Sequence, residues 1–343
     1  MREELKSGNR SIFSRKLQAY MDEALDSDKQ IILLQNRRGY SNFVSCRECG
    51  SVMKCPECEI SLTYHKKGEM MMCHYCGRKY PVPKACPSCS SKYIRYFGIG
   101  TEQVEEQVRL MYPDKAVDRL DIDRLKDRSE LDRILDKFGR GETDILVGTQ
   151  LVAKGLDFDN VGLVGVIAAD TTLNIPDYRS EERTFQLVTQ VAGRAGRGKD
   201  PGHVVIQTYE PENYAFTAAK EHDYEGFFNE ESRVRSFLEY PPFGDIIMMN
   251  LTGNDEEHVM KAADEARAYM LKIVGPKNEH RVKDPREAVN FKGNDAFRRY
   301  VLIKAPRGKR NEYVHYLDQF RKKLMTERSG VNVTIDINPY SII

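Results

Sequence analysis

Eight cysteines constrain the fold of this chain more than any other feature of its sequence. All of them lie between Cys46 and Cys89 in four C-x-x-C pairs, and the remainder of the 343 residues contains none. A C-x-x-C turn presents two thiolates along one edge of a tetrahedron, so four such turns supply two complete four-sulfur zinc sites. Disulfide frameworks spread their cysteines across small secreted chains, whereas this longer chain confines them to one segment.

The four pairs can combine in three ways, and the nested combination fits best. The two middle pairs are separated by fourteen residues, which is a zinc-ribbon spacing, and they give an inner site of Cys55, Cys58, Cys73 and Cys76. The first and last pairs then give an outer site of Cys46, Cys49, Cys86 and Cys89. Four thiolates leave no position for water, so both zinc ions are expected to be structural. Redox thiols and iron–sulfur ligands are the alternatives, and neither His65 nor His74 is expected as a ligand.

Composition places the chain among folded proteins with two or three domains. Hydrophobic residues make up 40% and charged residues 31%, and the formal net charge of +1 argues neither for nor against a nucleic-acid partner. No apolar run approaches the roughly 20 residues of a membrane span, and the start MREELKSGNR lacks the apolar core of a secretory signal. We therefore expect a cytoplasmic protein without a membrane partner.

Strands alternate with helices on both sides of the cysteine segment. Apolar runs at 31–36, 145–148, 161–169 and 203–208 predict strands. Helices are expected at 14–25, at 101–112 with Thr101 as its cap, at 129–138 with Ser129 as its cap, and at 182–193. This alternation predicts an α/β domain with a parallel sheet that is covered on both faces.

The pattern changes after the sequence YPPFG at 240–244. Strands at 246–251, 300–305 and 331–337, with helices at about 255–274 and 311–328, suit a small α+β domain of ferredoxin-like order. We therefore predict three parts: an α/β domain of residues 1–44 and 93–239, a zinc-binding insertion at 45–92, and an α+β domain at 240–343.

The chain lacks the phosphate-binding motif G-x-x-x-x-G-K-[ST]. The acidic sequence Asp255-Glu256-Glu257-His258 imitates the metal-binding acids of a motor protein, but no apolar strand leads into it. Acidic residues are favoured in the first turn of a helix by the helix dipole alone, and this is the interpretation we adopt.

Two other sequences resemble motifs V and VI of superfamily 2 helicases. In the first, DILVGTQLVAKGLDFDNV, Thr149 is followed by Gly155 and Asp157. In the second, QVAGRAGRG, the matching residues are Gln190, Gly193, Arg194, Gly196 and Arg197. The planar guanidinium groups of Arg194 and Arg197 can each bind two phosphate oxygens at once, which suits a nucleotide site. Without the rest of the motif, two arginines after a helix would be explained equally well by the helix dipole.

The sequences around the cysteines narrow the resemblance. NRRGY before them, SLTYH between them, GTE after them and YPPFG further on resemble the PriA family of primosomal replication-restart helicases over essentially the whole chain. The resemblance implies that the chain is the second RecA-like motor lobe with its zinc insertion and carboxy-terminal domain. The lobe that carries the Walker motifs would lie upstream of Met1.

The resemblance implies a role for each matching residue. Arg194 and Arg197 would reach the γ-phosphate of ATP, and Gln190 would position nucleotide or water. Gly155, Asp157 and Gly193 would contact or sense the nucleotide. DNA contacts are expected from Thr149 and from the helix start at Gly98, Gly100 and Thr101.

The resemblance also implies cofactors and partners. The intact protein would be a 3′-to-5′ DNA helicase that uses ATP and Mg²⁺, recognises stalled forks and promotes primosome assembly. Its partners would be single-stranded and forked DNA, primosome proteins and single-stranded DNA-binding protein, and it would act as a monomer. The isolated chain is expected not to hydrolyse ATP, because half of the composite site is absent.

A basic stretch at 275–310 holds eleven Lys/Arg and four Asp/Glu. Its residues Arg298, Arg299 and Lys304 alternate with the aromatic residues Phe291, Phe297 and Tyr300, which suits DNA binding. A half-exposed strand with aromatic residues inward and charges outward explains the same spacing, so both interpretations stay open.

Two other functions compete with the helicase motor. A non-catalytic zinc adaptor would bind nucleic acid or protein without needing Arg194 or Arg197. A different superfamily 2 translocase is the third possibility, and the double zinc insertion after NRRGY argues against it.

Overall fold

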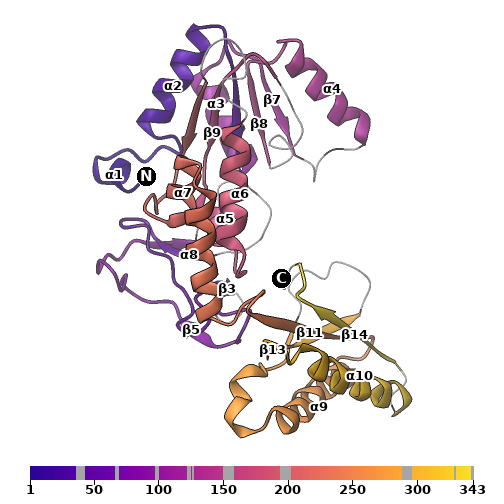
Figure 1. Cartoon of the computed structure of the whole chain (residues 1–343). Coiled ribbons are helices and arrows are strands. Elements are labelled where there is room, and N and C mark those ends of the chain that lie inside the picture. The colour runs from indigo at the N-terminus through magenta and orange to yellow at the C-terminus, as the bar shows by residue number, and fades with distance from the viewer. Residues whose placement is uncertain are drawn as a thin grey trace. The chain divides into compact units, whose positions relative to one another are not determined.

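The computed structural model describes residues 1–35, 43–65, 69–96, 100–121, 125, 127–149, 158–193, 202–287, 296–327 and 330–340 (Figure 1). The chain forms two compact units. The first consists of residues 1–53, 82–175 and 179–228, and the second consists of residues 54–81, 176–178 and 229–343. The cysteine segment is thus divided, because the outer pairs belong to the first unit and the inner pairs to the second.

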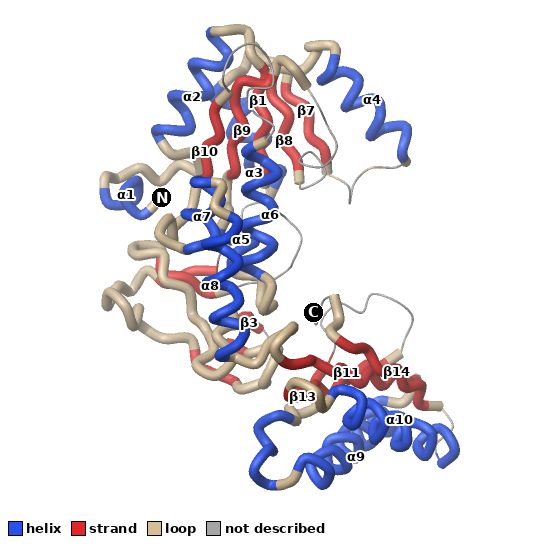
Figure 2. The backbone as a smooth tube through the Cα atoms, viewed as in Figure 1, coloured by secondary structure: helices blue, strands red, loops and turns tan. Residues whose placement is uncertain are grey.

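A five-stranded parallel sheet forms the centre of the first unit (Figure 2). Its strands, in spatial order, are β10 (His203–Ile206), β9 (Val161–Val166), β1 (Gln30–Leu34), β8 (Ile145–Gly148) and β7 (Val117–Leu120). All five residues of β1 and all four of β8 are buried. Continuous apolar strands of this kind require cover on both faces of the sheet.

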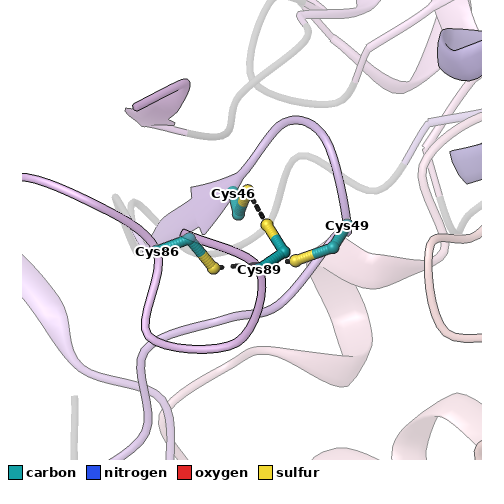
Figure 3. A group of neighbouring side chains, drawn as sticks. All are labelled: Cys46, Cys49, Cys86 and Cys89. Carbon is teal, nitrogen blue, oxygen red and sulfur yellow. Dashed lines mark hydrogen bonds between the residues drawn. The ribbon is translucent and has the colours of Figure 1, made fainter. Parts of the chain in front are cut away.

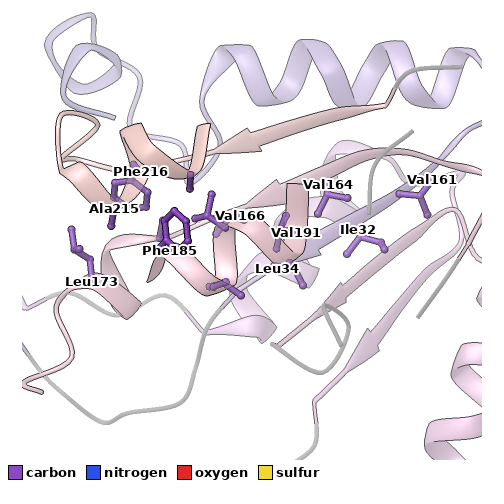
Figure 4. Close-up of a cluster of buried hydrophobic side chains, with 14 of the residues drawn as sticks. Ile32, Leu34, Val161, Val164, Val166, Leu173, Phe185, Val191, Ala215 and Phe216 are labelled. Carbon is purple, nitrogen blue, oxygen red and sulfur yellow. The ribbon is translucent and has the colours of Figure 1, made fainter. Parts of the chain in front are cut away.

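Helices supply that cover. On one face, α2 (Arg15–Asp26) and α3 (Thr101–Met111) pack Leu17, Met21, Val104 and Val108 against the sheet. The other face is covered by α4 (Arg128–Gly139), α6 (Ser180–Ala192) and α7 (Tyr214–Glu221). Figure 4 shows part of this second layer, in which Phe185, Val191 and Phe216 lie beside the strand residues Ile32, Leu34 and Val166. At about 25 cal/mol per Å² of buried apolar surface, these two layers supply the main stabilisation of the unit.

Shorter elements complete the first unit. These are α1 (Arg2–Lys6), α5 (Asp170–Leu173) and the antiparallel pair β2 (Val44–Cys46) and β6 (Ile94–Tyr96). Helix α8 (Tyr224–Phe237) begins in this unit and ends in the second.

Both predicted helix caps are shifted toward the amino end. Gly100 is the N-cap of α3, and Thr101 is already helical and fully buried. Asp127 is the N-cap of α4, where its side chain accepts a hydrogen bond from the Glu130 N–H at 3.0 Å. Asp accepts this bond at least as well as Ser, so the earlier acidic residue takes the position expected for Ser129.

The second unit contains an antiparallel sheet in the order β12-β13-β11-β14. Its elements, in chain order, are β11 (Gly244–Gly253), α9 (Glu256–Val274), the 3-10 helix η1 (Pro276–Arg281), β12 (Arg286–Glu287), β13 (Phe297–Pro306), α10 (Arg310–Glu327) and β14 (Val331–Ile337). This order and pairing give the expected ferredoxin-like arrangement. Asp255 caps α9 by accepting from the His258 N–H at 2.9 Å, in agreement with the helical interpretation of this acidic sequence.

Both faces of this second sheet are covered. Helices α9 and α10 pack on the face that carries Ile247, Met249, Val301 and Ile303. The alternate residues of β13, which include Tyr300 and Leu302, point to the opposite face and are also buried. A three-stranded antiparallel sheet completes the unit: β3 (Thr63–His65), β4 (Met70–Met72) and β5 (Lys79–Pro81).

The predicted fold class is confirmed: a RecA-like parallel sheet, a cysteine-rich region and a small α+β domain occur in one chain. The boundaries proposed for the three parts stay a prediction. Within the described residues, no helix combines the length and the apolar character that a membrane crossing requires.

Candidate metal centres and motor motifs

The eight thiols gather into two groups of four. Within each group the sulfur atoms all lie within 4.8 Å of one another, and the groups are those of the nested combination. In the outer group, the sulfurs of Cys46 and Cys89 are 3.6 Å apart, as are those of Cys49 and Cys86 (Figure 3). In the inner group, the sulfurs of Cys55 and Cys76 are 3.6 Å apart.

These distances fit a tetrahedral metal. Zn–S bonds of about 2.3 Å place two sulfurs about 3.8 Å apart along a tetrahedral edge, close to the spacing of the thiols here. Iron–sulfur ligation would need wider spacing around a multi-atom cluster. The donor set and its dimensions therefore suit a single zinc ion at each group.

The same turn builds all four C-x-x-C pairs. Four residues after the first cysteine of each pair, a backbone N–H donates to the carbonyl of that cysteine, at 2.8–2.9 Å. The residue that donates has a positive φ in every case, and the four residues are Gly50, Glu59, Gly77 and Ser90. Glycine adopts this conformation without steric cost, which makes the spacing C-x-x-C-G at two of the pairs a sequence signal that our prediction missed.

The ionisation of the thiols favours a bound cation. Burial raises the pKa of Cys49 to about 12. Burial also acts to raise the pKa of Cys86, but hydrogen bonds from the backbone of Ser88 and Cys89 lower it to about 7. Contacts with the neighbouring thiols raise the pKa of Cys58 far above its usual range. Four adjacent thiols do not all ionise by themselves, whereas a divalent cation stabilises four thiolates together.

The two groups differ in exposure. All four inner cysteines are buried, whereas Cys89 of the outer group is exposed and Cys49 is partly exposed. Neither His65 nor His74 belongs to a thiol group. Burial lowers the pKa of His74 to about 4, so its imidazole is neutral at physiological pH.

The residues of motifs V and VI are only partly within the described structure. Thr149 directly follows β8, at the carboxyl edge of the parallel sheet, and its side chain is buried. Gln190 is exposed in the last turn of α6, and Gly193 is the C-cap of this helix. Gly155, Asp157, Arg194 and Arg197 lie outside the described residues.

The helix start after the cysteine segment is built from Gly100 and Thr101. The Gly100 N–H donates to the Gln103 side chain at 3.3 Å, and the Thr101 hydroxyl donates to Asp121 at 3.1 Å. Any phosphate contact here would therefore involve backbone groups of the first turn. Gly98 lies outside the described residues.

The basic stretch is more embedded in the second unit than its sequence suggested. The Tyr300 hydroxyl donates to the His74 carbonyl at 3.1 Å and is buried. Lys304 donates to the Leu238 carbonyl at 2.6 Å, and burial lowers the pKa of Lys304 to about 8. Arg299 pairs with Glu287 at 3.1 Å and with Glu256 at 3.5 Å.

Other residues of the basic stretch keep both interpretations open. Arg298 is partly exposed on β13, and Phe297 is 41% exposed at the start of the strand. Phe291 lies outside the described residues. Tyr300 thus lies in the interior of the unit and Lys304 is only partly exposed, whereas DNA contacts by Arg298 and Arg299 stay a prediction.

Sequence reasoning missed an aromatic cluster beside the inner cysteines. Tyr178 stacks on Tyr240 with ring centroids 5.0 Å apart, and Tyr75 meets the same ring edge-on at 5.8 Å. The Tyr240 hydroxyl donates to the Cys58 carbonyl at 3.0 Å. Lys304 lies over the Tyr240 ring, 4.1 Å from its centroid. In the sequence, Tyr240 is marked only by its place in YPPFG.

Three family models match the chain. Residues 93–199 match the helicase conserved C-terminal domain, residues 55–81 match the Cys-rich region domain of the PriA DNA helicase, and residues 237–340 match the C-terminal domain of primosomal protein N.

Curated relatives extend the similarity to the whole chain. Replication restart protein PriA of Bacillus subtilis is 43% identical over all of this chain and 42% of its own length. The protein of the same name from Synechocystis is also 43% identical, over all of this chain and 41% of its length. That from Treponema pallidum is 36% identical over 97% of this chain and 50% of its length. The chain therefore spans about two fifths to one half of these relatives.

The parallel sheet and the first family match define a class of protein, the helicases with a conserved C-terminal domain. The cysteine-rich region and the carboxy-terminal domain distinguish one group within this class. The chain belongs to the PriA family and matches the carboxy-terminal part of its members.

Proposed function

We propose that this chain forms the second motor lobe, the zinc module and the carboxy-terminal domain of an ATP-dependent DNA helicase. The intact protein would move 3′ to 5′ on single-stranded DNA, recognise stalled or branched forks and promote primosome assembly for replication restart. Membership of the PriA family supports this proposal.

The observation that carries the proposal is the position of Thr149. It follows β8, the strand beside the central β1, at the carboxyl edge of the sheet. Ligands of open parallel sheets bind beyond this edge, and motif V begins at this residue. Helix α6 supports the proposal further, because it bears Gln190 near its end and Gly193 as its cap.

We assign roles to the motif residues accordingly. Arg194 and Arg197 stabilise the charge that develops on the γ-phosphate, as arginine fingers do, and Gln190 orients nucleotide or water. Gly155, Asp157 and Gly193 would contact or sense the nucleotide. ATP and Mg²⁺ would be held mainly by the first lobe, so the isolated chain is expected not to hydrolyse ATP.

The cysteine groups would each hold one structural zinc ion, with Cys46, Cys49, Cys86 and Cys89 as outer ligands and Cys55, Cys58, Cys73 and Cys76 as inner ligands. Close spacing of the thiols supports this assignment. Zinc would fix the turns and supply folding free energy without taking part in a reaction.

DNA contacts are proposed for Thr149, for the start of α3 at Gly100 and Thr101, and for Arg298 and Arg299. Single-stranded and forked DNA, primosome proteins and single-stranded DNA-binding protein are the proposed partners. We propose a monomer that acts in the cytoplasm.

Strand separation by the intact protein tests this function. The longer protein that contains this chain is mixed with forked duplexes that carry a single-stranded tail of either polarity. ATP-dependent separation that requires a 3′ tail supports the proposal. DNA binding without any ATP-dependent separation would favour the zinc adaptor, and separation from 5′ tails alone would contradict the proposed polarity.

A further inference from the structure

Tyr75 is a buried tyrosine in one of the two turns that carry the inner cysteines. It lies between Cys73 and Cys76, and its side chain is 1% exposed. Its hydroxyl oxygen accepts a hydrogen bond from the backbone N–H of Tyr178 at 3.1 Å. A buried tyrosine needs such a partner for its hydroxyl, so the turn that presents two zinc ligands also holds a distant backbone segment.

The side chain of Tyr178 is held by the same part of the unit. Its ring stacks on Tyr240 at an interplanar angle of 17°, and the Tyr240 hydroxyl donates to the Cys58 carbonyl. The guanidinium of Arg235 lies over the Tyr178 ring, 5.1 Å from its centroid. Segment 176–178 is thus connected to both inner C-x-x-C turns. It contacts the Cys73 turn directly through Tyr75, and it reaches the Cys55 turn through Tyr240.

Tyr178 is placed where its position matters for the motor. Helix α6 begins at Ser180, two residues further along the chain, and continues to Ala192. The helix bears Gln190 and leads into Gly193 and the arginines of motif VI. A helix transmits displacement along its length, since its backbone hydrogen bonds hold it as a rigid rod.

We propose that Tyr75 and Tyr178 are positioning residues that link metal binding at the inner cysteine group to the start of helix α6. Metal at the inner group fixes the turn that bears Tyr75, and Tyr75 in turn fixes segment 176–178. Coupling of this kind is reciprocal, so displacement of segment 176–178 weakens metal binding at the inner group by the same factor. The consequence for ATP hydrolysis rests on the proposed function, whereas the link itself does not.

Amide hydrogen exchange of residues 176–180 tests the link in the chain as it stands. The zinc-loaded chain is compared with Tyr75→Phe, which keeps the ring but removes the acceptor. With both zinc ions still bound, exchange at the Tyr178 amide should rise about 2- to 10-fold, as expected for one buried hydrogen bond. Exchange in β1 should stay constant, which a general loss of stability would not allow.

A second comparison does not depend on that variant. Cys58→Ser removes an inner ligand and Cys89→Ser removes an outer ligand. Exchange at 176–180 should rise in Cys58→Ser and stay unchanged in Cys89→Ser. Equal exchange in Cys58→Ser and the parent chain would overturn the proposal, as would an equal rise in Cys89→Ser.

In the longer protein, Tyr75→Phe should lower the kcat of DNA-stimulated ATP hydrolysis while the Kd for single-stranded DNA stays constant. Failure of the unmutated longer protein to hydrolyse ATP would contradict the proposed function and leave the exchange result intact. Hydrolysis that is unaffected by Tyr75→Phe, despite faster exchange at 176–180, would overturn the connection to the motor.

Discussion

Replacing Tyr300 by Phe tests how the inner cysteine turns are joined to the antiparallel sheet. Tyr300 lies on β13, opposite the face covered by helices, and is 1% exposed. Its hydroxyl donates to the His74 carbonyl, and burial raises the pKa of Tyr300 to about 12, so the donor proton is present at neutral pH. Tyr300→Phe keeps the buried ring and removes only this donor.

The expected loss follows from the acceptor that remains. A buried carbonyl without its donor costs about 1–3 kcal/mol in unfolding free energy. The ring still fills its space, so the larger cost of a cavity, about 3–5 kcal/mol for removal of a whole aromatic ring, does not arise. With a urea dependence of about 2 kcal/mol/M, a loss of 2 kcal/mol lowers the unfolding midpoint by about 1 M.

Urea unfolding of the zinc-saturated chain is monitored by hydrogen exchange of separate peptides, which reports the unfolding midpoint of each unit on its own. The midpoint of β13 should fall in Tyr300→Phe, whereas that of β9 should not change. Tyr93→Phe is the matched control, since Tyr93 is 65% exposed and belongs to the first unit. A change in β13 no larger than that caused by Tyr93→Phe would refute the reasoning.

Three further predictions concern pH, backbone strain and metal removal. Burial raises the pKa of Asp170 from 3.8 to about 6, so the folded chain holds a proton that the unfolded chain releases between about pH 4 and 6. The unfolding free energy should therefore fall by about 3 kcal/mol as pH rises through this window, and Asp170→Asn should remove that slope in pH-dependent urea titrations. Gly77→Ala should cost more than the roughly 1–2 kcal/mol of a positive φ, because its new Cβ meets the buried Arg286, whereas Gly141→Ala, at a similar φ with open space, should show the backbone cost alone. A coloured zinc chelator should remove zinc in two steps, first from the group with the exposed Cys89; one uniform step would contradict the difference in burial.

Much of the fold follows from local patterns. Continuous apolar runs predicted β1, β8 and β9, and the helical spacing of Val104 and Val108 predicted α3 within one residue. The spacing of the C-x-x-C pairs predicted which thiols lie together. Strand β12 was missed because its two residues are too few to show any periodicity.

The role of Tyr300 was beyond the reach of local patterns. Its partner His74 lies 226 residues away in the chain, and Tyr240 and Cys58 are 182 residues apart. Alternating basic and aromatic residues look the same whether the strand faces DNA or a second layer of the same protein. Only the placement of the inner cysteine turns on this face shows why Tyr300 is buried and Lys304 partly covered.

The motif V and VI residues, in contrast, were predicted from the sequence but are mostly not described by the structure. Arg194, Arg197, Gly155 and Asp157 were predicted from motif spacing alone, and they lie outside the described residues. Their assignment stays a prediction. The described motif residues nearest to them are Thr149, which directly follows β8 at the edge of the sheet, and Gly193, which caps α6.

The measurement that tests the central claim most directly is DNA-stimulated ATP hydrolysis by the longer protein with Arg197→Ala. Arg140→Ala is the matched control, because Arg140 is an exposed arginine of the same lobe that pairs with Glu142. The account predicts a loss in kcat of about 10³-fold for Arg197→Ala, typical of an arginine finger, and no loss for Arg140→Ala. Unchanged hydrolysis in Arg197→Ala would contradict the assignment of this chain as the lobe that completes the nucleotide site.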